Sequence, residues 1–353
     1  MNKVENYLLG MDCGTTNIKA VIIGEDGTVA AEASRPNCFI CPGPGMQEQD
    51  AGRWWENSVE IFRALCEEAG MEVVRRIRGI GISSHTVTML PVDKDGVPLR
   101  NALTYQDTRS GGELDCIVDT IGWERFVNMV GGRPGAGFLP SKILWFKKNE
   151  PELFARTSSF MQASSYINFK LTGKRTIDID QAARTQCLDI STMDWASEIG
   201  DVIGVDLDSV MPPLKLVNEI IGFVTDEAAD ATGLVSGIPV IAGCSDAMAS
   251  MYAMGMSRLG EAGESSGTSS LVFVGSDVKS APDFPVVTKP CAITGMPWVF
   301  DAPITTTGLA LNWYIETMAA EERAAAKEQG KDIYTYLNEL ALEADPGSGG
   351  LLF

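Results

Sequence analysis

The stretch Asp12-Cys13-Gly14-Thr15-Thr16-Asn17-Ile18-Lys19 decides the fold of this chain, because a related stretch, Glu264-Ser265-Ser266-Gly267-Thr268-Ser269-Ser270, repeats its pattern far along the sequence. Each stretch places glycine and hydroxyl residues beside an apolar run, as expected for a tight turn next to a strand. The first turn lies between the apolar runs 7–11 and 18–23, and the second leads into the run 271–274. The sequence therefore predicts that the same structure, a tight glycine-containing turn beside a strand, occurs twice in the chain.

A turn of this composition is suited to bind phosphate. Glycine at Gly14 and Gly267 allows positive φ and a close approach of backbone N–H groups to an anion, and the hydroxyls of Thr15, Thr16 and Thr268 add donors without bulk. Alone, each turn is more often an ordinary hairpin than a phosphate site, so both interpretations stand for either one. Their repetition in matching context favours phosphate binding.

Two charged residues flank the first turn. Asp12 ends the opening strand, where its carboxylate would repel a phosphate but is suited to hold a Mg²⁺ ion through water. Lys19 would supply a positive point charge to a β- or γ-phosphate. The stretch therefore predicts a site for a magnesium–nucleotide complex.

The composition favours a cytosolic enzyme. A chain of 353 residues exceeds one comfortable core, so we expect two domains. The chain has 28 basic and 47 acidic residues, and its net charge of −19 argues against nucleic acid or an anionic membrane as partner. No run of about 18 apolar residues and no signal-peptide pattern is present, so we expect a cytoplasmic protein.

Several common sites are excluded by their missing motifs. The sequence has neither G-x-x-x-x-G-K-[ST] nor G-x-G-x-x-G, and His85 is its single histidine, which removes multi-histidine metal sites. Eight cysteines are scattered without a disulfide framework. Cys38 and Cys41 form one C-x-x-C, but no second pair exists and a Pro/Gly loop follows, so a loop is favoured over a zinc or redox site.

Alternating strand and helix patterns predict an α/β fold. Antiparallel strands over 7–11, 17–23 and 28–34 open the chain, the last two joined by a hairpin turn at Asp26-Gly27. Asp50 is the predicted N-cap of a helix that ends at Gly70 and whose apolar residues recur at helical spacing. The remaining predictions are a strand over 77–82 with a polar exit, helices over 141–148 and 161–171, and the apolar helix positions Trp55, Val59, Phe62, Leu65 and Ala69.

Asp246 is the candidate catalytic carboxylate. A strand within 237–243 leads to it, and a helix of small residues over 247–255 follows. Phosphoryl transfer to a hydroxyl group needs one carboxylate that orients the hydroxyl and accepts its proton. The alternative role of Asp246 is a helix N-cap. Its position shortly before the second phosphate turn favours the catalytic role.

Five separated motifs carry a resemblance to a known family. They are D-C-G-T-T-N-I-K at 12–19, S-S-H-T at 83–86, Y-Q-D-T-R at 105–109, A-G-C-S-D at 242–246 and S-G-T-S-S at 266–270. In this order they resemble the FGGY family of carbohydrate kinases, along the whole chain. The resemblance implies an α/β, actin/hexokinase-like ATPase fold: two ribonuclease-H-like domains, 1–255 and 256–353, with ATP and sugar in the cleft between them.

The resemblance also implies roles for residues. Asp246 matches the catalytic base and Asp12 the carboxylate near Mg²⁺. Asp107 and Arg109 match a substrate motif in which Tyr105 replaces the usual tryptophan, although a structural ion pair is an equal alternative. The nucleotide or phosphate ligands would be Asp12, Gly14, Thr15, Thr16, Lys19, Gly267, Thr268, Gly308 and Asn312; the substrate ligands would be Ser84, His85, Thr86, Asp107, Arg109 and Asp246.

Some of these implied roles have plain alternatives. Asn312 is either a nucleotide contact or an exposed helix residue. His85 is either a ligand of a sugar hydroxyl or a packed polar residue. At the strand exit, 84–87 reads S-H-T-V, unlike the Q-M-H-G of xylulose kinases or the N-Q-R-E of glycerol kinases, whereas the opening motif and 139–154 look closer to L-xylulose and L-fuculose kinases.

The implied activity is transfer of phosphate from Mg²⁺-ATP to a hydroxyl of a small sugar, a ketose, or of a polyol. Family members continue beyond residue 353, so the second domain is expected to be incomplete. Two other readings stay open: an actin-like ATPase without a sugar acceptor, and a non-catalytic sugar-binding fragment. A homodimer also stays open.

Overall fold

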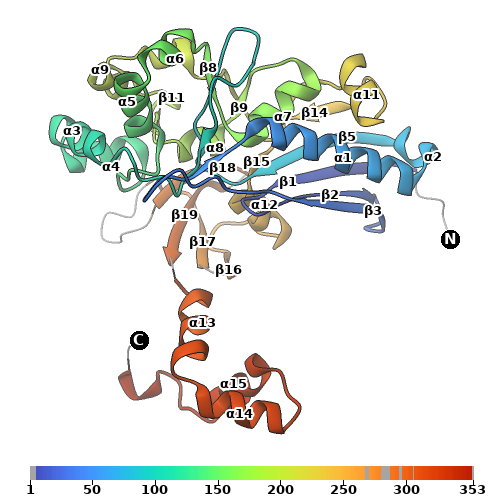
Figure 1. Cartoon of the computed structure of the whole chain (residues 1–353), viewed down its shortest axis with the longest axis vertical. Coiled ribbons are helices and arrows are strands. Elements are labelled where there is room, and N and C mark those ends of the chain that lie inside the picture. Colours follow the sequence, from blue (N-terminus) through green and yellow to red (C-terminus); the bar gives the residue numbers. More distant parts are fainter. Residues whose placement is uncertain (1–4, 267–269, 280–286, 294–295, 305, 352–353) are drawn as a thin grey trace. The chain divides into compact units, whose positions relative to one another are not determined.

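The computed structural model describes residues 5–266, 270–279, 287–293, 296–304 and 306–351. Its elements follow the predicted alternation of strands and helices (Figure 1). The chain has two compact units: unit 1 is Met1–Gly263 with Phe273–Asp301, and unit 2 is Glu264–Val272 with Ala302–Phe353. The predicted phosphate ligands Gly267 and Thr268 lie outside the described residues.

Unit 1 is built on a seven-stranded sheet. Its order is β13-β14-β5-β1-β2-β3, with β15 paired to β5. β2 is antiparallel to both β1 and β3, which confirms the predicted antiparallel opening, while β1, β14 and β15 run parallel to β5. The strands are β1 Tyr7–Cys13, β2 Asn17–Gly24, β3 Val29–Pro36, β5 Ile77–Ser84, β13 Ile220–Phe223, β14 Pro239–Ile241 and β15 Cys244–Ser245.

Alternation along β1 and β2 gives the sheet two different faces. Leu9, Met11 and Cys13 are buried on one face, opposite the buried side chains of β2. Asp12 and Lys19, which pair with each other, point to the other face because successive strand residues alternate. One face therefore builds the core, and the other carries the charged residues of the first motif.

Two long helices, α1 and α7, cover the apolar face of this sheet (Figure 1). α1 spans Ala51–Ala69, and Asp50 caps it by accepting a hydrogen bond from the Gly52 N–H at 2.8 Å, as predicted. Phe62 and Leu65 are buried as predicted, but Trp54 is fully buried in place of Trp55, which is only partly buried. The buried residues of α1 are Ala51, Trp54, Ser58, Ile61, Phe62, Leu65 and Cys66.

The predicted helix over 161–171 begins later than expected. Met161 belongs to β8, Ser159–Met161, because it pairs with Leu90 of β6, Leu90–Val92. α7 therefore starts after this strand and spans Ala163–Thr172; it ends at Gly173 in the left-handed conformation. The other predicted helix, 141–148, is α5, Leu139–Asn149.

A second core of unit 1 lies among the helices between β7 and β12. Phe146 and Phe160 are fully buried in it, and partly buried Phe154 packs against both, with ring centroids 5.9–6.5 Å apart. The elements here are β4 Glu48–Gln49, β7 Ala102–Leu103, α3 Gly111–Ile121, α4 Trp123–Val130, α6 Pro151–Arg156, β9 Ile177–Asp178, α8 Ile179–Arg184, β10 Leu188–Asp189, β11 Asp194–Trp195, α9 Ser197–Ile203, α10 Leu207–Val210 and β12 Leu214–Lys215.

The remaining elements complete the two units. Within unit 2, α13, α14 and α15 pack in sequence with Ile315 and Ala326 buried. Four strands form a second sheet in the order β16-β17-β19-β18. The bounds are α2 Met71–Val74, α11 Asp226–Thr232, α12 Asp246–Ala253, β16 Ala262–Ser266, β17 Ser270–Ser276, β18 Val287–Ile293, β19 Met296–Ile304, α13 Gly308–Thr317, α14 Ala320–Glu328 and α15 Ile333–Ala341.

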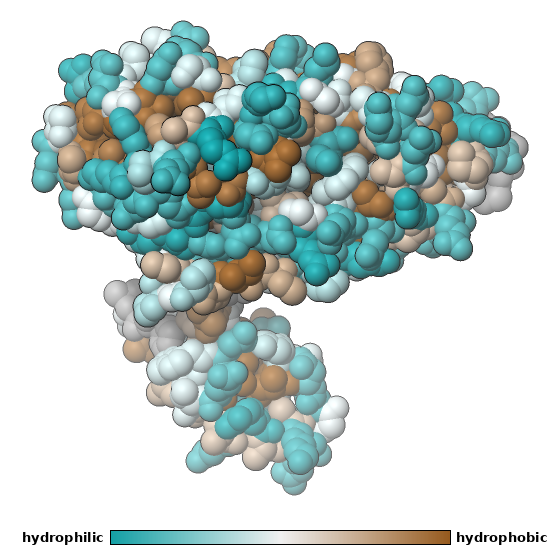
Figure 2. Space-filling view, turned by 45° about the horizontal axis from the view of Figure 1, so that its top comes forward, coloured by the Kyte–Doolittle hydropathy of each residue, from teal (hydrophilic) through white to brown (hydrophobic). Residues whose placement is uncertain are grey.

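The surface of unit 1 is mainly hydrophilic in the view of Figure 2, as the excess of acidic residues leads one to expect. In the described part of the chain, every helix is too short or too polar to cross a membrane.

Candidate active site

A row of polar side chains crosses the central sheet on the face opposite α1. Asp12 pairs with Lys19 on β2 and with Ser83 on β5, and Ser83 in turn pairs with Cys244 on β15. Lys19 pairs with Ser34 of β3, which extends the row to a fifth strand. Strand register, rather than sequence proximity, thus brings residues of the first and fourth motifs to one line.

A hollow of about 1000 Å³ lies along this face and is lined by Asp12, Lys19, Ser83, Cys244 and Tyr252, among others. Glycines keep it open, because they leave the strands without side chains there. Gly243 is required most strictly: its φ is +83°, and a Cβ would lie 2.0 Å from the carbonyl oxygen of Ile82. The sheet therefore offers a bare surface next to the charged row.

The turn at 14–16 is held from behind by two amide side chains. Asn37 Nδ2 donates to the carbonyl of Gly14 at 2.9 Å, and the Asn37 N–H donates to the carbonyl of Thr16 at 2.8 Å. Gln49 Nε2 donates to the carbonyl of Thr15 at 2.9 Å. In a planar trans peptide the N–H points opposite to the C=O. The N–H groups of Thr15 and Thr16, which follow the carbonyls of Gly14 and Thr15, therefore point away from these two amide side chains.

The reason for Gly14 differs from the one predicted. Gly14 is not among the glycines with positive φ. Instead, a Cβ at this position would lie 2.8 Å from the carbonyl oxygen of Asn17 and 3.1 Å from Asp12 Oδ2. Glycine is needed because the backbone and a carboxylate approach it closely. Thr15 is half-buried, whereas Thr16 and Lys19 are exposed beside it.

Asp12 suits a magnesium ion in both chemistry and position. Its Oδ1 accepts a hydrogen bond from Ser83 Oγ at 2.8 Å, and its Oδ2 faces the phosphate turn next to Gly14. Mg²⁺ commonly keeps most of its water and takes one or two carboxylates together with substrate phosphates. The donor set therefore fits this ion. Among the described residues, no three His, Cys, Asp or Glu side chains gather as a closed metal site.

Asp246 is the first residue of α12 and is not its cap. The neighbouring Ser245 takes that role, accepting from the Met248 N–H at 3.1 Å. Asp246 Oδ1 accepts from the Ala247 N–H at 2.7 Å, and its side chain reaches solvent. The surrounding protein removes part of its hydration, and this, followed by the negative charge of Asp12, raises the pKa of Asp246 to about 6.

His85 lies buried at the exit of β5 with one nitrogen in use. Its Nδ1 is 2.8 Å from the carbonyl oxygen of Cys13, so Nδ1 carries the proton and donates it. Burial lowers the pKa of His85, which favours the neutral ring. Trp54 packs against it edge to face at 6.0 Å. Nε2 is then an acceptor, and it has no partner among the described residues.

Further polar atoms without a described partner surround this strand exit. They are the buried hydroxyls of Thr86 and Thr88 and the Nε2 of Gln162. The Oε1 of Gln162 accepts a hydrogen bond from the Thr88 N–H at 2.8 Å. Ser84 is instead engaged inside the protein, since its hydroxyl accepts from the Ser164 N–H at 3.2 Å. Sequence reasoning missed Gln162, because a lone glutamine before a helix carries no local signal.

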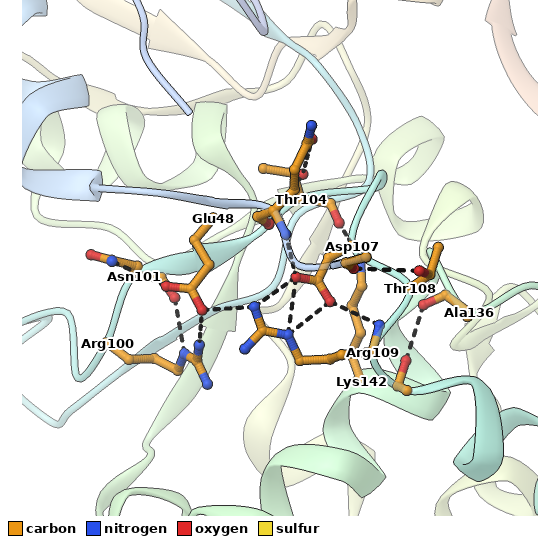
Figure 3. Close-up of polar contacts among 12 residues, drawn as sticks. Glu48, Arg100, Asn101, Thr104, Asp107, Thr108, Arg109, Ala136 and Lys142 are labelled. Carbon is orange, nitrogen blue, oxygen red and sulfur yellow. Dashed lines mark hydrogen bonds and ion pairs between the residues drawn. The ribbon is translucent and has the colours of Figure 1, made fainter. Parts of the chain in front are cut away.

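Asp107 and Arg109 form the structural ion pair that the sequence left as an alternative (Figure 3). Asp107 is fully buried, and its Oδ2 accepts from Arg109 Nη2 at 2.8 Å and from the Gln47 N–H at 2.7 Å. Glu48 Oε1 bridges to Arg109 Nη2 at 2.8 Å and to Arg100 Nη2 at 2.5 Å. Both arginines also lie over the ring of Trp145.

Lys142 completes this buried network. Its Nζ donates to the carbonyls of Thr104 and Gly137 at 2.5 and 2.6 Å. Burial lowers the pKa of Lys142 to about 7. We call Glu48, Arg100, Asp107, Arg109 and Lys142 the buried network (Figure 3).

Within unit 2, Gly308 is the first residue of α13, and Asn312 lies exposed one turn later. Asn312 Oδ1 accepts a hydrogen bond from Tyr334 of α15 at 2.8 Å. The hydroxyls of Ser270 and Thr307 lie 2.9 Å apart at the start of α13. The helix that the resemblance assigns to nucleotide binding is thus present, with both residues at its first turns.

Known proteins share this sequence and fold. The N-terminal domain model of the FGGY family of carbohydrate kinases matches residues 7–253. Xylulose kinase of Bacillus subtilis (strain 168) is 28% identical over 349 residues, which are 98% of this chain and 67% of that protein. Autoinducer-2 kinase of Escherichia coli (strain SMS-3-5 / SECEC) is 27% identical over 352 residues, 98% of this chain and 66% of that protein.

Solved structures agree. The xylulose kinase from Rhodospirillum rubrum has a TM-score of 0.87 at 28% identity, covering 97% of this chain and 68% of that one. The Plasmodium falciparum glycerol kinase with ADP has a TM-score of 0.83 at 21% identity, covering 92% and 66%. The expected α/β fold of the actin/hexokinase-like type is confirmed. The chain spans about two thirds of the length of these relatives.

Proposed function

Because this chain belongs to the FGGY family of carbohydrate kinases, we propose that it transfers phosphate from Mg²⁺-ATP to a hydroxyl group of a small sugar, a ketose, or of a polyol, with Asp246 as the general base. The observation that carries the proposal is the sheet register. It places Asp12, the tied phosphate turn and the strand leading to Asp246 at the same face and end of one sheet.

Asp246 would orient the acceptor hydroxyl and take its proton during transfer. Its carboxylate reaches solvent, and the Ala247 N–H fixes one of its oxygens. A pKa of about 6 leaves it mostly ionised at neutral pH and still basic enough to accept a proton. Ser245 supplies the helix cap, so the carboxylate of Asp246 is free for this task.

The phosphates would bind the outward N–H groups of the turn at 14–16, with Lys19 adding charge. Asp12 would hold Mg²⁺ through water, and the ion, when bound, offsets the charge of the phosphates. Gly267, Thr268, Gly308 and Asn312 would contribute to the nucleotide site, as the family resemblance implies. We also propose that the chain has two domains, an N-terminal one at 1–255 that binds the sugar and the phosphates and a C-terminal one at 256–353 that binds the nucleotide.

The sugar would lie at the exit of β5. Neutral His85 offers an acceptor at Nε2, and Gln162 offers a donor at its Nε2, so a neighbouring pair of hydroxyls or a hydroxyl beside a carbonyl would satisfy both. Thr86 adds a further hydroxyl to this exit. Xylulose kinases among the relatives support a ketose. Asp107 and Arg109 would support the site from behind.

The test measures ADP formation by the protein at its full natural length, with Mg²⁺-ATP and a panel of ketopentoses, deoxyketoses, four- to six-carbon polyols and glycerol. One acceptor should stimulate turnover, and Asp246→Asn should abolish the stimulated part. Turnover without any acceptor, unchanged in Asp246→Asn, would indicate an actin-like ATPase instead. Sugar binding without turnover would indicate a non-catalytic protein. We expect the active protein in the cytoplasm, and gel filtration would decide whether it is a homodimer.

A further inference from the structure

A cluster of buried charges lies behind the first turn of α12. Asp180, Arg184, Asp301 and Lys289 are 0%, 8%, 3% and 3% exposed. Arg184 Nε donates to Asp180 Oδ1 at 2.8 Å, and its Nη1 donates to Asp301 Oδ2 at 2.9 Å. Lys289 Nζ donates to the carbonyl of Ala183 at 3.1 Å. Two positive and two negative side chains balance, so the cluster has no net charge.

The second carboxylate oxygen of Asp180, Oδ2, bonds Ser245. Asp180 Oδ2 accepts two hydrogen bonds from Ser245, from its N–H at 3.0 Å and from its hydroxyl at 2.5 Å. Ser245 is fully buried, so water does not compete for these bonds. Both the backbone and the side chain of Ser245 are therefore fixed by a single carboxylate that lies 65 positions away in the sequence.

The same serine sets the start of α12. Its hydroxyl donates to Asp180 and accepts from the Met248 N–H at 3.1 Å. Asp246 follows directly, and its carboxylate is bonded to the next N–H, that of Ala247. A shift of Ser245 would therefore turn the peptide that leads into Asp246 and move its carboxylate.

Stability alone does not account for the cluster. Burying charges costs solvation energy, and apolar residues of similar volume often stabilise a protein as well or better. The cluster is also incompletely satisfied, since Arg184 Nη2 and Asp301 Oδ1 have no partner among the described residues. What the charges achieve is orientation, because Arg184, itself held by Asp301, fixes one oxygen of Asp180 and thereby sets the direction of the oxygen that bonds Ser245.

We infer that Asp180 is a positioning residue: anchored by Arg184, which Asp301 holds in turn, it holds Ser245 and thereby fixes the Asp246 carboxylate for phosphoryl transfer. The inference rests on the proposed function, because it assigns Asp180 to the geometry of the proposed base. Asp180 acts through Ser245 and does not itself contact the substrate.

The experiment compares four proteins at full natural length: wild type, Asp180→Ala, Asp180→Asn and Ser245→Ala. Thr232→Ala is the matched control, since it removes another fully buried hydroxyl, on α11, that bonds a helix carbonyl at 2.6 Å. The kcat and the KM of the acceptor are measured per folded protein, and hydrogen exchange of the Met248 amide is measured without substrate. Exchange reports the geometry of the cap independently of catalysis.

Misplacing a catalytic group by about 1 Å can cost up to about 100-fold in rate. We expect Asp180→Ala to lower kcat about 10- to 100-fold with KM changed less than about threefold, and to speed exchange at Met248. Asp180→Asn should recover part of kcat, because its amide oxygen can still accept from the Ser245 N–H. Ser245→Ala, which leaves every charge in place, should lower kcat and speed exchange as well, while Thr232→Ala should change neither.

Wild-type kcat in Asp180→Ala or in Ser245→Ala would overturn the inference, and so would a loss in KM alone. If Asp180→Ala does not fold, Ser245→Ala decides the question by itself. Failure of the proposed function has a different signature, because the wild type would then show no acceptor-stimulated turnover, or Asp246→Asn would retain it. The two ideas can thus fail separately.

Discussion

The charged row on the open sheet face and the buried network of Glu48, Arg100, Asp107, Arg109 and Lys142 use charges in opposite ways. In and beside the row, Asp12 is bonded by a hydroxyl, the turn at 14–16 by neutral amides, and Asp246 by one N–H. In the buried network, carboxylates face guanidinium groups at 2.5–2.8 Å. Groups held by neutral bonds stay available to a ligand, whereas removing one partner of a buried ion pair destabilises the fold, whatever the pair itself contributes.

The largest expected effect separates the two regions by their chemistry. Asp246→Asn should lower kcat by about 10²- to 10⁴-fold, because general-base catalysis is lost, while the melting temperature does not fall. Steady-state kinetics and a thermal scan of the same sample give both numbers. A kcat within a few fold of wild type would remove Asp246 from the catalytic role.

The matched change in the buried network should do the reverse. Glu48→Gln replaces the carboxylate that Arg100 and Arg109 share with a neutral amide, while Arg100 keeps its pair with Glu150 and Arg109 its pair with Asp107. Because each arginine keeps one carboxylate, we expect a loss of about 2 kcal/mol of unfolding free energy. The kcat of the remaining folded protein should stay within about threefold of wild type. Urea unfolding measures the loss. Unchanged stability would show that the network is not structural.

A smaller effect is expected from the support of the phosphate turn. Asn37→Ala removes the bond from Nδ2 to the Gly14 carbonyl but keeps the backbone bond to Thr16. One lost hydrogen bond of this kind is worth about 1 kcal/mol, so the KM for ATP should rise about fivefold with little change in kcat. Asn57→Ala is a control, because its amide bonds the Pro36 carbonyl on the exposed surface. A selective rise in the KM of the sugar would contradict the assignment.

The smallest effect is a pH dependence. The pKa of Asp246 is raised in the folded state to about 6, so its contribution to stability is fully present below its unfolded pKa and is lost as pH rises through about 6. Asp246→Asn should therefore raise the melting temperature slightly at pH 8 and leave it unchanged, or lower it, at pH 4. Because the carboxyl reaches solvent, the shift should be only a few degrees. Equal shifts at both pH values would contradict the raised pKa.

Local sequence predicted the parts of the fold that depend on near neighbours. The hairpin of β2 and β3, the Asp50 cap of α1 and the strand that leads towards Asp246 all follow from signals within a few residues, and the FGGY family assignment from the five motifs is confirmed. On α1, Phe62 and Leu65 are buried as predicted, but Trp55 is not. Trp54 and Trp55 are both aromatic, and only packing against the sheet selects Trp54.

The hydrogen bonds that hold the site in place could not be predicted from local sequence. Gln49 bonds the phosphate turn across 34 positions, and Asp180 bonds Ser245 across 65. Neither has a local motif, because its partner is chosen by the register of distant strands. Gly14 was expected to adopt a positive φ, whereas the structure shows a close approach of the Asn17 carbonyl and no positive φ. Tertiary contacts therefore decide how a recognised motif is held.

The extra residue at Gly243 fixes the number of residues in the strand segment that precedes Asp246. Val240 pairs with Ile80 and Cys244 with Ser83, so four steps on one strand accompany three on the other. The extra residue is absorbed at Gly243, where a side chain has no room. Strand faces alternate with every residue, so removing one residue here would reverse the facing of Cys244 and Ser245. The number of residues between Val240 and Asp246 is therefore fixed, and we expect this segment to tolerate neither a deletion nor an insertion.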